Sequence, residues 1–197
     1  MLRALVLAAA LASSGCLVLS LQPVYDAASV VYDEALIGTW VNTEDETSAT
    51  VERGEWRSYK VAYTDRFSTR AFHGNLTRIG TATWLDLTEV RGRDDGPFLL
   101  PVHGIFRVSV AGDVLSVAPL DYGWFTRAIE QKPAGLPIAT LDDRRNIVIS
   151  SSTAELRRWL TGAPAEAVAT ATTYRRGQVR QVGHVGGRVG QVGRVGR

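Results

Sequence analysis

Alternating apolar and polar positions mark a series of strands in the first two thirds of the chain. Short runs rich in aromatic and β-branched residues are separated by turn residues at fairly regular spacing, which is typical of antiparallel β-proteins. These runs predict strands at 36–41, 49–53, 57–63, 70–79, 83–89, 103–110 and 114–117. Tyr59, Val61 and Tyr63 share one face of their strand, and Phe106 and Val108 share one face of theirs. Each strand therefore has a buried side and a wetter side.

Two helices are predicted late in the chain. Residues 120–132 place Leu120, Trp124 and Ala128 on one apolar stripe, and Pro133 ends the pattern. The second helix, at about 153–161, begins with a capping box in which Ser152 and Glu155 satisfy the amide groups of the first turn.

The remaining segments complete a mainly β fold. A hairpin is predicted from strands at 137–141 and 146–150, and a last strand from 167–174. The pattern as a whole predicts an antiparallel sandwich or barrel with two short helices.

The first sixteen residues have the order of an export signal. Arg3 gives a positive start, residues 4–12 are apolar, and a Ser-Ser-Gly run precedes Cys16. A membrane-spanning helix, which needs about 20 apolar residues, and plain secretion with a free Cys16 are the alternatives. A cysteine directly after small residues resembles the lipobox of bacterial lipoproteins, which implies that Cys16 is acylated and holds the protein to a membrane. Because Leu17 rather than aspartate follows, the resemblance implies the outer membrane rather than the inner one.

Length and composition predict one domain between two simpler segments. After a signal peptide at 1–15, residues 16–35 are expected to form a tether, and residues 36–176 a barrel domain. The tail at 177–197 repeats a Val-Gly unit and is expected to be disordered, because isolated valines bury too little apolar surface. Cys16 is the sole cysteine, so no intramolecular disulfide can form.

Charge is distributed unevenly along the chain. The net charge is +2, but residues 1–174 carry about 16 basic against 20 acidic residues, because the tail holds arginines and no acid. Proteins that bind nucleic acid present clustered basic surface to the phosphates. The predicted barrel domain lacks such an excess, so nucleic acid is not expected as a partner.

A short motif near the first strand suggests a family. Gly38-Thr39-Trp40 resembles the Gly-x-Trp opening of lipocalins and related barrels, in which the tryptophan plugs the closed end. Together with the signal, the meander and the late helix, residues 16–176 resemble bacterial envelope lipoproteins with a lipocalin-like barrel. The resemblance implies a plug of Gly38 and Trp40 covered by an arginine from a late strand, and Arg175 is the candidate.

Motifs for catalysis or metal binding are weak. The histidines, His73, His103 and His184, are far apart, and none has a second ligand at metal spacing, so no metal or cofactor is expected. Asp94-Asp95 and Asp142-Asp143 lie in turn-rich segments, where aspartate bonds its own backbone. An enzyme is not expected. A concave cluster that joins His103 to a carboxylate and a hydroxyl would favour one.

The aromatic residues indicate a binding function. A small barrel either fills its interior with such side chains or leaves a cavity lined by them. The candidates for lining a cavity are Tyr59, Tyr63, Trp84, Phe106 and Trp124.

Two functions follow from these observations. The first is a membrane-anchored envelope lipoprotein that binds or carries a small apolar ligand in its barrel. The second is a non-catalytic module that holds another envelope protein, which an exposed apolar patch beside the helix at 120–132 would favour.

Overall fold

The computed structural model describes residues 17–90, 100–131, 136–140 and 146–177. The predicted signal peptide, Cys16 and all of the predicted tail except Gly177 lie outside the described residues. The two aspartate pairs and His184 lie outside them as well.

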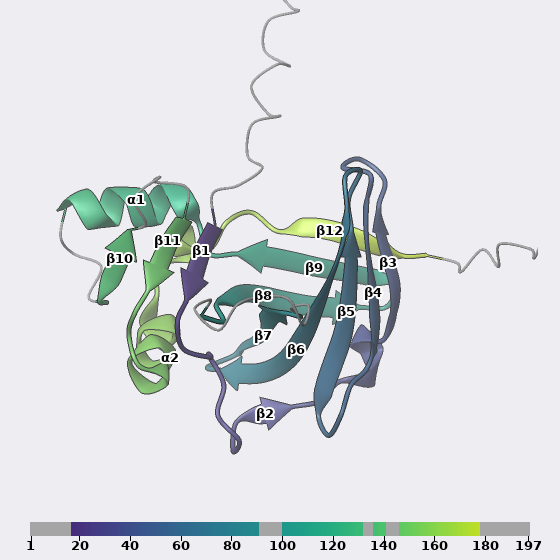
Figure 1. Ribbon diagram of the computed structural model, residues 1–197, viewed down its shortest axis with the longest axis horizontal. Helices are drawn as coiled ribbons and strands as arrows, with labels where there is room; N and C mark the ends of the chain where they lie inside the picture. Colours follow the sequence, from purple (N-terminus) through teal and green to yellow (C-terminus); the bar gives the residue numbers. More distant parts are fainter. Residues whose placement is uncertain (1–16, 91–99, 132–135, 141–145, 178–197) are drawn as a thin grey trace, which may run out of the picture.

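Eight antiparallel strands close into a barrel, which confirms the predicted fold class (Figure 1). The strands are β3 (Gly38–Asn42), β4 (Thr47–Arg53), β5 (Ser58–Thr64), β6 (Thr69–Ile79), β7 (Ala82–Glu89), β8 (His103–Ala111), β9 (Val114–Pro119) and β12 (Thr172–Arg176). Strand β12 lies between β9 and β3, and β9 also pairs with β8, so the ring has no open edge. Full closure leaves no unpaired strand edge in the ring for another chain to pair with.

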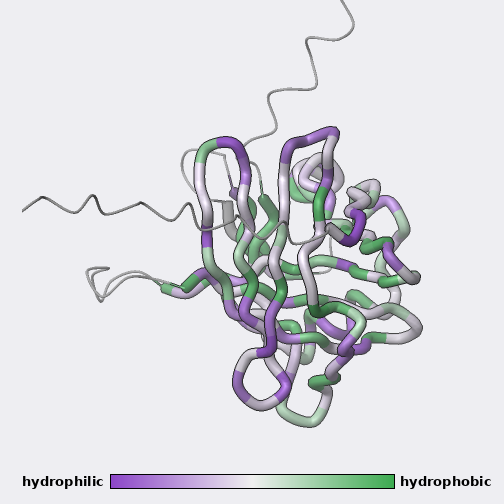
Figure 2. The backbone as a smooth tube through the Cα atoms, turned by 90° about the vertical axis from the view of Figure 1, so that its right-hand side faces the viewer, coloured by the Kyte–Doolittle hydropathy of each residue, from purple (hydrophilic) through white to green (hydrophobic). Residues whose placement is uncertain are grey.

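The predicted alternation of buried and exposed positions holds in the barrel. Tyr59 and Val61 of β5 pack with Leu85 of β7 and Val108 of β8 in one buried cluster inside the ring. Arg107, next to Val108, points outward and is exposed. Figure 2 shows hydrophilic residues concentrated at the ends of the long hairpins.

The last strand begins later than predicted. Ala167, the first residue of the predicted strand, ends the short 3₁₀ turn η2 (Ala165–Ala167), and regular pairing begins only at Thr172. Val168 makes a single bridge to Leu120. Three of the residues 167–171 are alanines, which have low β-propensity, whereas Thr172, Thr173 and Tyr174 are β-branched or aromatic. Residues 167–171 are therefore weaker strand formers than the residues that follow them.

A second layer covers the outer face of the barrel on one side (Figure 1). It consists of two helices and three short strands: α1 (Tyr122–Gln131), α2 (Thr153–Gly162), β1 (Leu17–Ser20), β10 (Ile138–Thr140) and β11 (Asn146–Ile149). The predicted hairpin is confirmed, because β10 and β11 pair antiparallel. Neither helix has the length and continuous apolar character that a membrane crossing requires.

The predicted capping box at the start of α2 is present. The Ser152 hydroxyl accepts from the Glu155 amide, and the Glu155 carboxylate accepts from the Ser152 amide at 2.9 Å. The hydrogen bonds from the side chain and backbone of Ser152 lower the pKa of the Glu155 carboxyl. The helix start is thus determined locally, as the sequence indicated.

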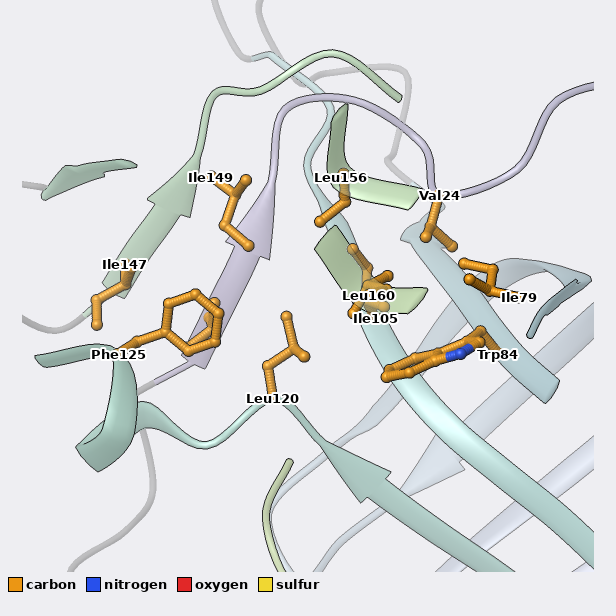
Figure 3. Close-up of a cluster of buried hydrophobic side chains, with 11 residues drawn as sticks. Val24, Ile79, Trp84, Ile105, Leu120, Phe125, Ile147, Ile149, Leu156 and Leu160 are labelled. Carbon is orange, nitrogen blue, oxygen red and sulfur yellow. The ribbon is translucent and has the colours of Figure 1, made fainter. Parts of the chain in front are cut away.

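The second layer and the barrel wall enclose a second hydrophobic core (Figure 3). Its residues come from the outer face of β6–β8 and from the elements of the second layer, including Ile79, Trp84, Ile105, Phe125 and Leu156. Where the second layer covers them, strands β6–β8 are therefore buried on both faces, like strands of a sheet with a layer on each side.

The segment predicted as a tether is instead part of the fold. Residues 17–35 include β1, which lies parallel to β11 and antiparallel to the start of β8. They also include β2 (Val30–Val31), paired with β6, and the 3₁₀ turn η1 (Glu34–Leu36). Runs this short carry no recognisable period, and their pairing partners lie far along the chain. The sequence pattern could not indicate either strand.

Polar side chains from the barrel and α2 bind the connection between β1 and β2. Arg157 of α2 donates from Nη1 to the Val24 carbonyl and to the Thr77 hydroxyl, each at 2.8 Å. The hydroxyl of Thr153 donates to the Pro23 carbonyl at 2.7 Å. Five-donor guanidinium groups suit this task, because one side chain can satisfy several carbonyls at once. The chain directly after residue 20 is thereby held against the barrel wall.

Candidate functional site

Trp40, the tryptophan of the Gly-x-Trp motif, belongs to the barrel core, and we call it together with Gly38 and Arg176 the plug. Its side chain is fully buried, and its indole Nε1 donates to the Leu36 carbonyl at 2.8 Å. The guanidinium of Arg176 lies 4.2 Å from the centre of the indole ring. This distance is within the range of a cation–π interaction.

The arginine that covers Trp40 is Arg176, not the predicted Arg175. In the register of β12 against β3, Arg176 stands opposite Trp40 and Arg175 stands opposite Val41. Side chains alternate between the faces of a strand, so a shift of one residue exchanges inside for outside. Arg176 also donates to the carbonyls of Ile37 at 2.8 Å and Ala35 at 2.9 Å. The guanidinium therefore joins the plug to the last strand.

Gly38 provides the space that Arg176 occupies. Its φ of +138° is in a region that side chains disfavour, and a Cβ there would lie 2.5 Å from Nη1 of Arg176. The two residues of the motif therefore act together. The absence of a side chain at Gly38 leaves room for the guanidinium of Arg176, and that guanidinium covers the ring of Trp40.

The aromatic residues predicted to line a cavity fall into two groups. Tyr59 and Phe106 belong to the barrel cluster, and Tyr63 lies on the same face of β5 as Tyr59. Trp84 and Trp124 belong to the second core outside the barrel. No residue of either group lines the pocket described below. Tyr59, Phe106, Trp84 and Trp124 pack against other residues of the two cores.

Tyr59 illustrates this structural use of an aromatic side chain. It is fully buried and stacks on Tyr32 with the ring centres 5.0 Å apart. Its hydroxyl accepts from the Asp33 amide at 2.7 Å and donates to the Asp33 carbonyl at 3.2 Å. Burial raises the pKa of the Tyr59 phenol to about 12. Tyr59 therefore holds the turn before the plug in place.

A pocket of about 400 Å³ lies near the plugged end of the barrel. We call it the notch pocket. Its apolar wall is formed by Leu36, Leu76, Val108 and Val110, all of which belong to or pack on the barrel core. Its polar lining includes Thr81, Thr83, Arg107, Ser109 and Ser116. The remaining lining residues are Asp33 and the alanines at 82, 118 and 171.

The register of β7 against β8 explains why the notch pocket exists. Pairing between these strands ends at Thr83 and Val108, but β8 continues to Ala111. Past that point the register contains no further pair between β7 and β8. Residues from both faces of β8 consequently line the pocket, with Val108 inside and Arg107 outside. The sequence carries no sign of this notch, because strand offset is set by pairing.

A histidine, a carboxylate and a hydroxyl meet on the outer face of β7 and β8. Nδ1 of His103 lies 2.7 Å from Oδ1 of Asp86 and 3.2 Å from the Thr88 hydroxyl. Asp86 is 1% exposed, and its other oxygen accepts from the Val24 amide at 2.8 Å. None of the three residues lines the notch pocket. Through Asp86, these three residues of β7 and β8 connect the barrel wall to the segment after β1. We assign them the role of holding that segment in position.

Sequence reasoning named His103 but missed Asp86. An available signal was an acid between Leu85 and Leu87, inside a strand whose neighbours are apolar. Buried carboxylates require hydrogen-bond partners, so such a position indicates a polar contact from another element. Among the residues that the structure describes, no three metal-ligating side chains gather into a group.

Comparisons with known proteins found no match, so only the fold indicates the class of protein. No protein-family model, curated protein or solved structure matches this chain. The closed eight-stranded antiparallel barrel is compatible with a lipocalin-like fold. The fold alone does not assign a function, which has to be argued from the notch pocket.

Proposed function

We propose that the protein is a lipid-anchored envelope lipoprotein whose barrel binds a small apolar ligand in the notch pocket. The observation that carries the proposal is the notch pocket itself, with about 400 Å³ beside an aliphatic wall of the barrel core. Pockets for small molecules span roughly 300–1,000 Å³ and combine an apolar lining with a few polar groups. The notch pocket meets the volume criterion, and seven of its thirteen lining residues are apolar.

The plug supports this proposal by making the pocket wall rigid. Leu36 lines the pocket, and its carbonyl accepts from the buried Trp40 indole. Arg176 binds the carbonyls on either side of Leu36. A wall that is already ordered costs little entropy when a ligand enters.

Ligand binding is tested on protein purified from its own membranes under native conditions. Mass spectrometry of the retained small molecules should detect an apolar compound with the wild-type chain. Ala171→Trp fills the pocket from an exposed lining position, so it should lose the compound. Ala71→Trp, at an exposed strand position outside the pocket, is the matched control and should retain it. An empty wild-type protein, or equal retention by both variants, would contradict the proposal.

Membrane attachment through Cys16 is tested separately. Cys16→Ser removes the thiol that would form the thioether to diacylglycerol, so the variant should leave the membrane fraction or stay unprocessed. More than one acyl chain gives stable attachment at about 0.8 kcal/mol per buried methylene. Because β1 begins at Leu17, an anchor at Cys16 would place the barrel directly at the membrane surface. Unchanged fractionation of Cys16→Ser would show that lipid at this residue is not the anchor. Subfractionation of the envelope tests the proposed outer-membrane location.

An interaction module for another envelope protein is the second candidate. The observation in its favour is Phe67, an aromatic residue on the turn between β5 and β6 that is 86% exposed. The expected patch beside the first helix is not seen, because α1 carries none of the large exposed apolar side chains of the described residues. A protein that co-purifies with wild type but not with Phe67→Ser, together with an empty pocket, would favour this candidate.

A further inference from the structure

Arg107 stands at the outer edge of the notch pocket with its charge uncompensated. It lies on β8, is exposed, and lines the pocket beside Val108. In the part of the chain that the structure describes, its side chain forms no hydrogen bond, ion pair or ring contact. Arg157 and Arg176, by contrast, each bind backbone carbonyls. Arg107 is therefore available to a ligand in a way that these two arginines are not.

The surroundings of Arg107 favour an anion. Hydroxyl groups of Thr81, Thr83, Ser109 and Ser116 line the same pocket and can donate hydrogen bonds. The acidic residue in the lining is Asp33, whose carboxylate accepts from the Ala35 amide at 2.9 Å and caps η1. One arginine and several hydroxyl donors thus line the pocket, and its one acidic residue is held by the turn that it caps.

The opposite wall favours a hydrocarbon chain. Leu36, Leu76, Val108 and Val110 are aliphatic and belong to or pack on the barrel core. Burying apolar surface contributes about 25 cal/mol per Å², so a chain that leaves water along this wall is stabilised. The alternation along β8 places the aliphatic wall inside the barrel and Arg107 outside it. A ligand that satisfies both must have an apolar part and a charged end.

We propose that the notch pocket takes a single-chain amphiphile with an anionic head group, whose charge pairs with Arg107 while its chain lies along the aliphatic wall. The inference rests on the proposed function, because it names the ligand class of the same pocket. A fatty carboxylate and a monoalkyl phosphate share this chemistry. Arginine binds either group through two parallel N–H donors.

Three probes with one chain length test the inference on delipidated full-length protein. Decanoate, decyl phosphate and decanol are titrated by calorimetry below the concentrations at which they form micelles. At least one anionic probe should bind about tenfold more tightly than decanol, because a charge-assisted hydrogen bond is added to the same apolar contact. Affinity for that probe should fall as salt is added, whereas affinity for decanol should not.

Variants assign the effect to Arg107. Arg107→Gln should reduce the affinity of the anionic probe to about that of decanol and leave decanol binding unchanged. Arg175→Gln is the matched control, since Arg175 is also exposed on a barrel strand but lies outside the pocket. Its affinities should equal those of wild type. Circular dichroism checks that both variants fold.

The outcomes separate this inference from the proposed function. Equal binding of decanol and both anions, or an Arg107→Gln variant that loses nothing, overturns the anionic ligand and leaves an apolar pocket standing. No binding by any probe counts against the pocket as a ligand site and against the proposed function together. Preference for decanoate identifies a carboxylate ligand, and preference for decyl phosphate identifies a phosphate ligand. Either preference supports the inference.

Discussion

The barrel core and the second core use the same strands in different ways. Inside the ring, Leu85 and Leu87 of β7 meet other inward-facing residues of the barrel. On the outer face of the same strand, Trp84 packs beneath the second layer and Asp86 binds His103 and Val24. The inner core consists of the apolar residues at alternate positions of consecutive strands. The outer core joins segments from both ends of the chain.

This difference shows how a closed barrel acquires a second buried surface. A barrel wall normally faces solvent on its outer side, so polar residues alternate with apolar ones. Here β1, β11 and both helices cover the wall, and Trp84 and Ile105 become buried. Asp86 and Arg157 fasten the segment around Val24 over them by binding its amide and its carbonyl, whereas the buried Nε1 of Trp84 has no hydrogen-bond partner among the described residues. The two cores should therefore depend on each other.

The largest expected effect comes from removing the plug of the inner core. Trp40→Ala should lower the free energy of unfolding by about 3–5 kcal/mol, because it deletes a fully buried indole and leaves a cavity. Urea unfolding followed by circular dichroism measures it. Trp56→Ala is the matched control at a residue that is 69% exposed, and it should stay within about 0.5 kcal/mol of wild type. A wild-type midpoint for Trp40→Ala would mean that the plug is not a structural element.

A truncation in the outer core tests whether the cores unfold together. Leu156→Ala removes a fully buried side chain of α2 and should cost about 2–5 kcal/mol. Because β6–β8 belong to both cores, we expect one cooperative transition with unchanged slope. Two separate transitions, seen by fluorescence and by circular dichroism, would show that the second layer is an independent unit.

Asp86 tests the polar connection within the outer core. Asp86→Ala should cost about 1–3 kcal/mol, since it leaves the buried Val24 amide without its acceptor. Asp86→Asn keeps an acceptor oxygen and should cost less. Hydrogen exchange should then report faster exchange at Val24 in the alanine variant. Equal stability of the two variants would argue against the hydrogen bond as the cause.

The two neighbouring arginines of β12 test the register at the plug. Arg176→Ala should cost about 1–2 kcal/mol, through lost bonds to two carbonyls and the lost contact with Trp40. Arg175→Ala should change stability by about 0.5 kcal/mol or less, because its side chain is exposed. The reverse order would indicate that β12 pairs one residue away from the register described.

The last effect, which changes nothing near neutral pH, concerns the ionisation of Tyr59. Its phenol has a pKa raised from 10.0 to about 12, so the folded state favours the protonated form. The resulting stability is present in full below pH 10 and is lost as the pH rises toward 12. Urea midpoints measured across that range should fall for wild type. Tyr59→Phe cannot ionise there and should lose less over the same interval; equal slopes would contradict this linkage.

Several parts of the fold were readable from the sequence because they depend on local interactions. The alternation along Tyr59, Val61 and Tyr63 predicted a strand with one buried face, and β5 is such a strand. Ser152 and Glu155 predicted the start of α2, because a capping box forms between residues three apart. The Gly-x-Trp motif lies within a single strand, β3, where Trp40 is buried two residues after Gly38. Each of these signals lies within a few residues.

Other features were decided only by the tertiary structure. Arg176 rather than Arg175 covers Trp40 because the register of β12 against β3 selects one of two adjacent side chains. Leu17–Ser20 forms a strand because β8 and β11 lie beside it. Both partners are far along the chain, so the local sequence did not indicate this strand. The notch pocket exists because β7 ends its pairing before β8 does. The local sequence determines which face of a strand is apolar. Pairing between distant segments determines how far neighbouring strands are offset from each other, and that offset determines where a pocket can form in the barrel.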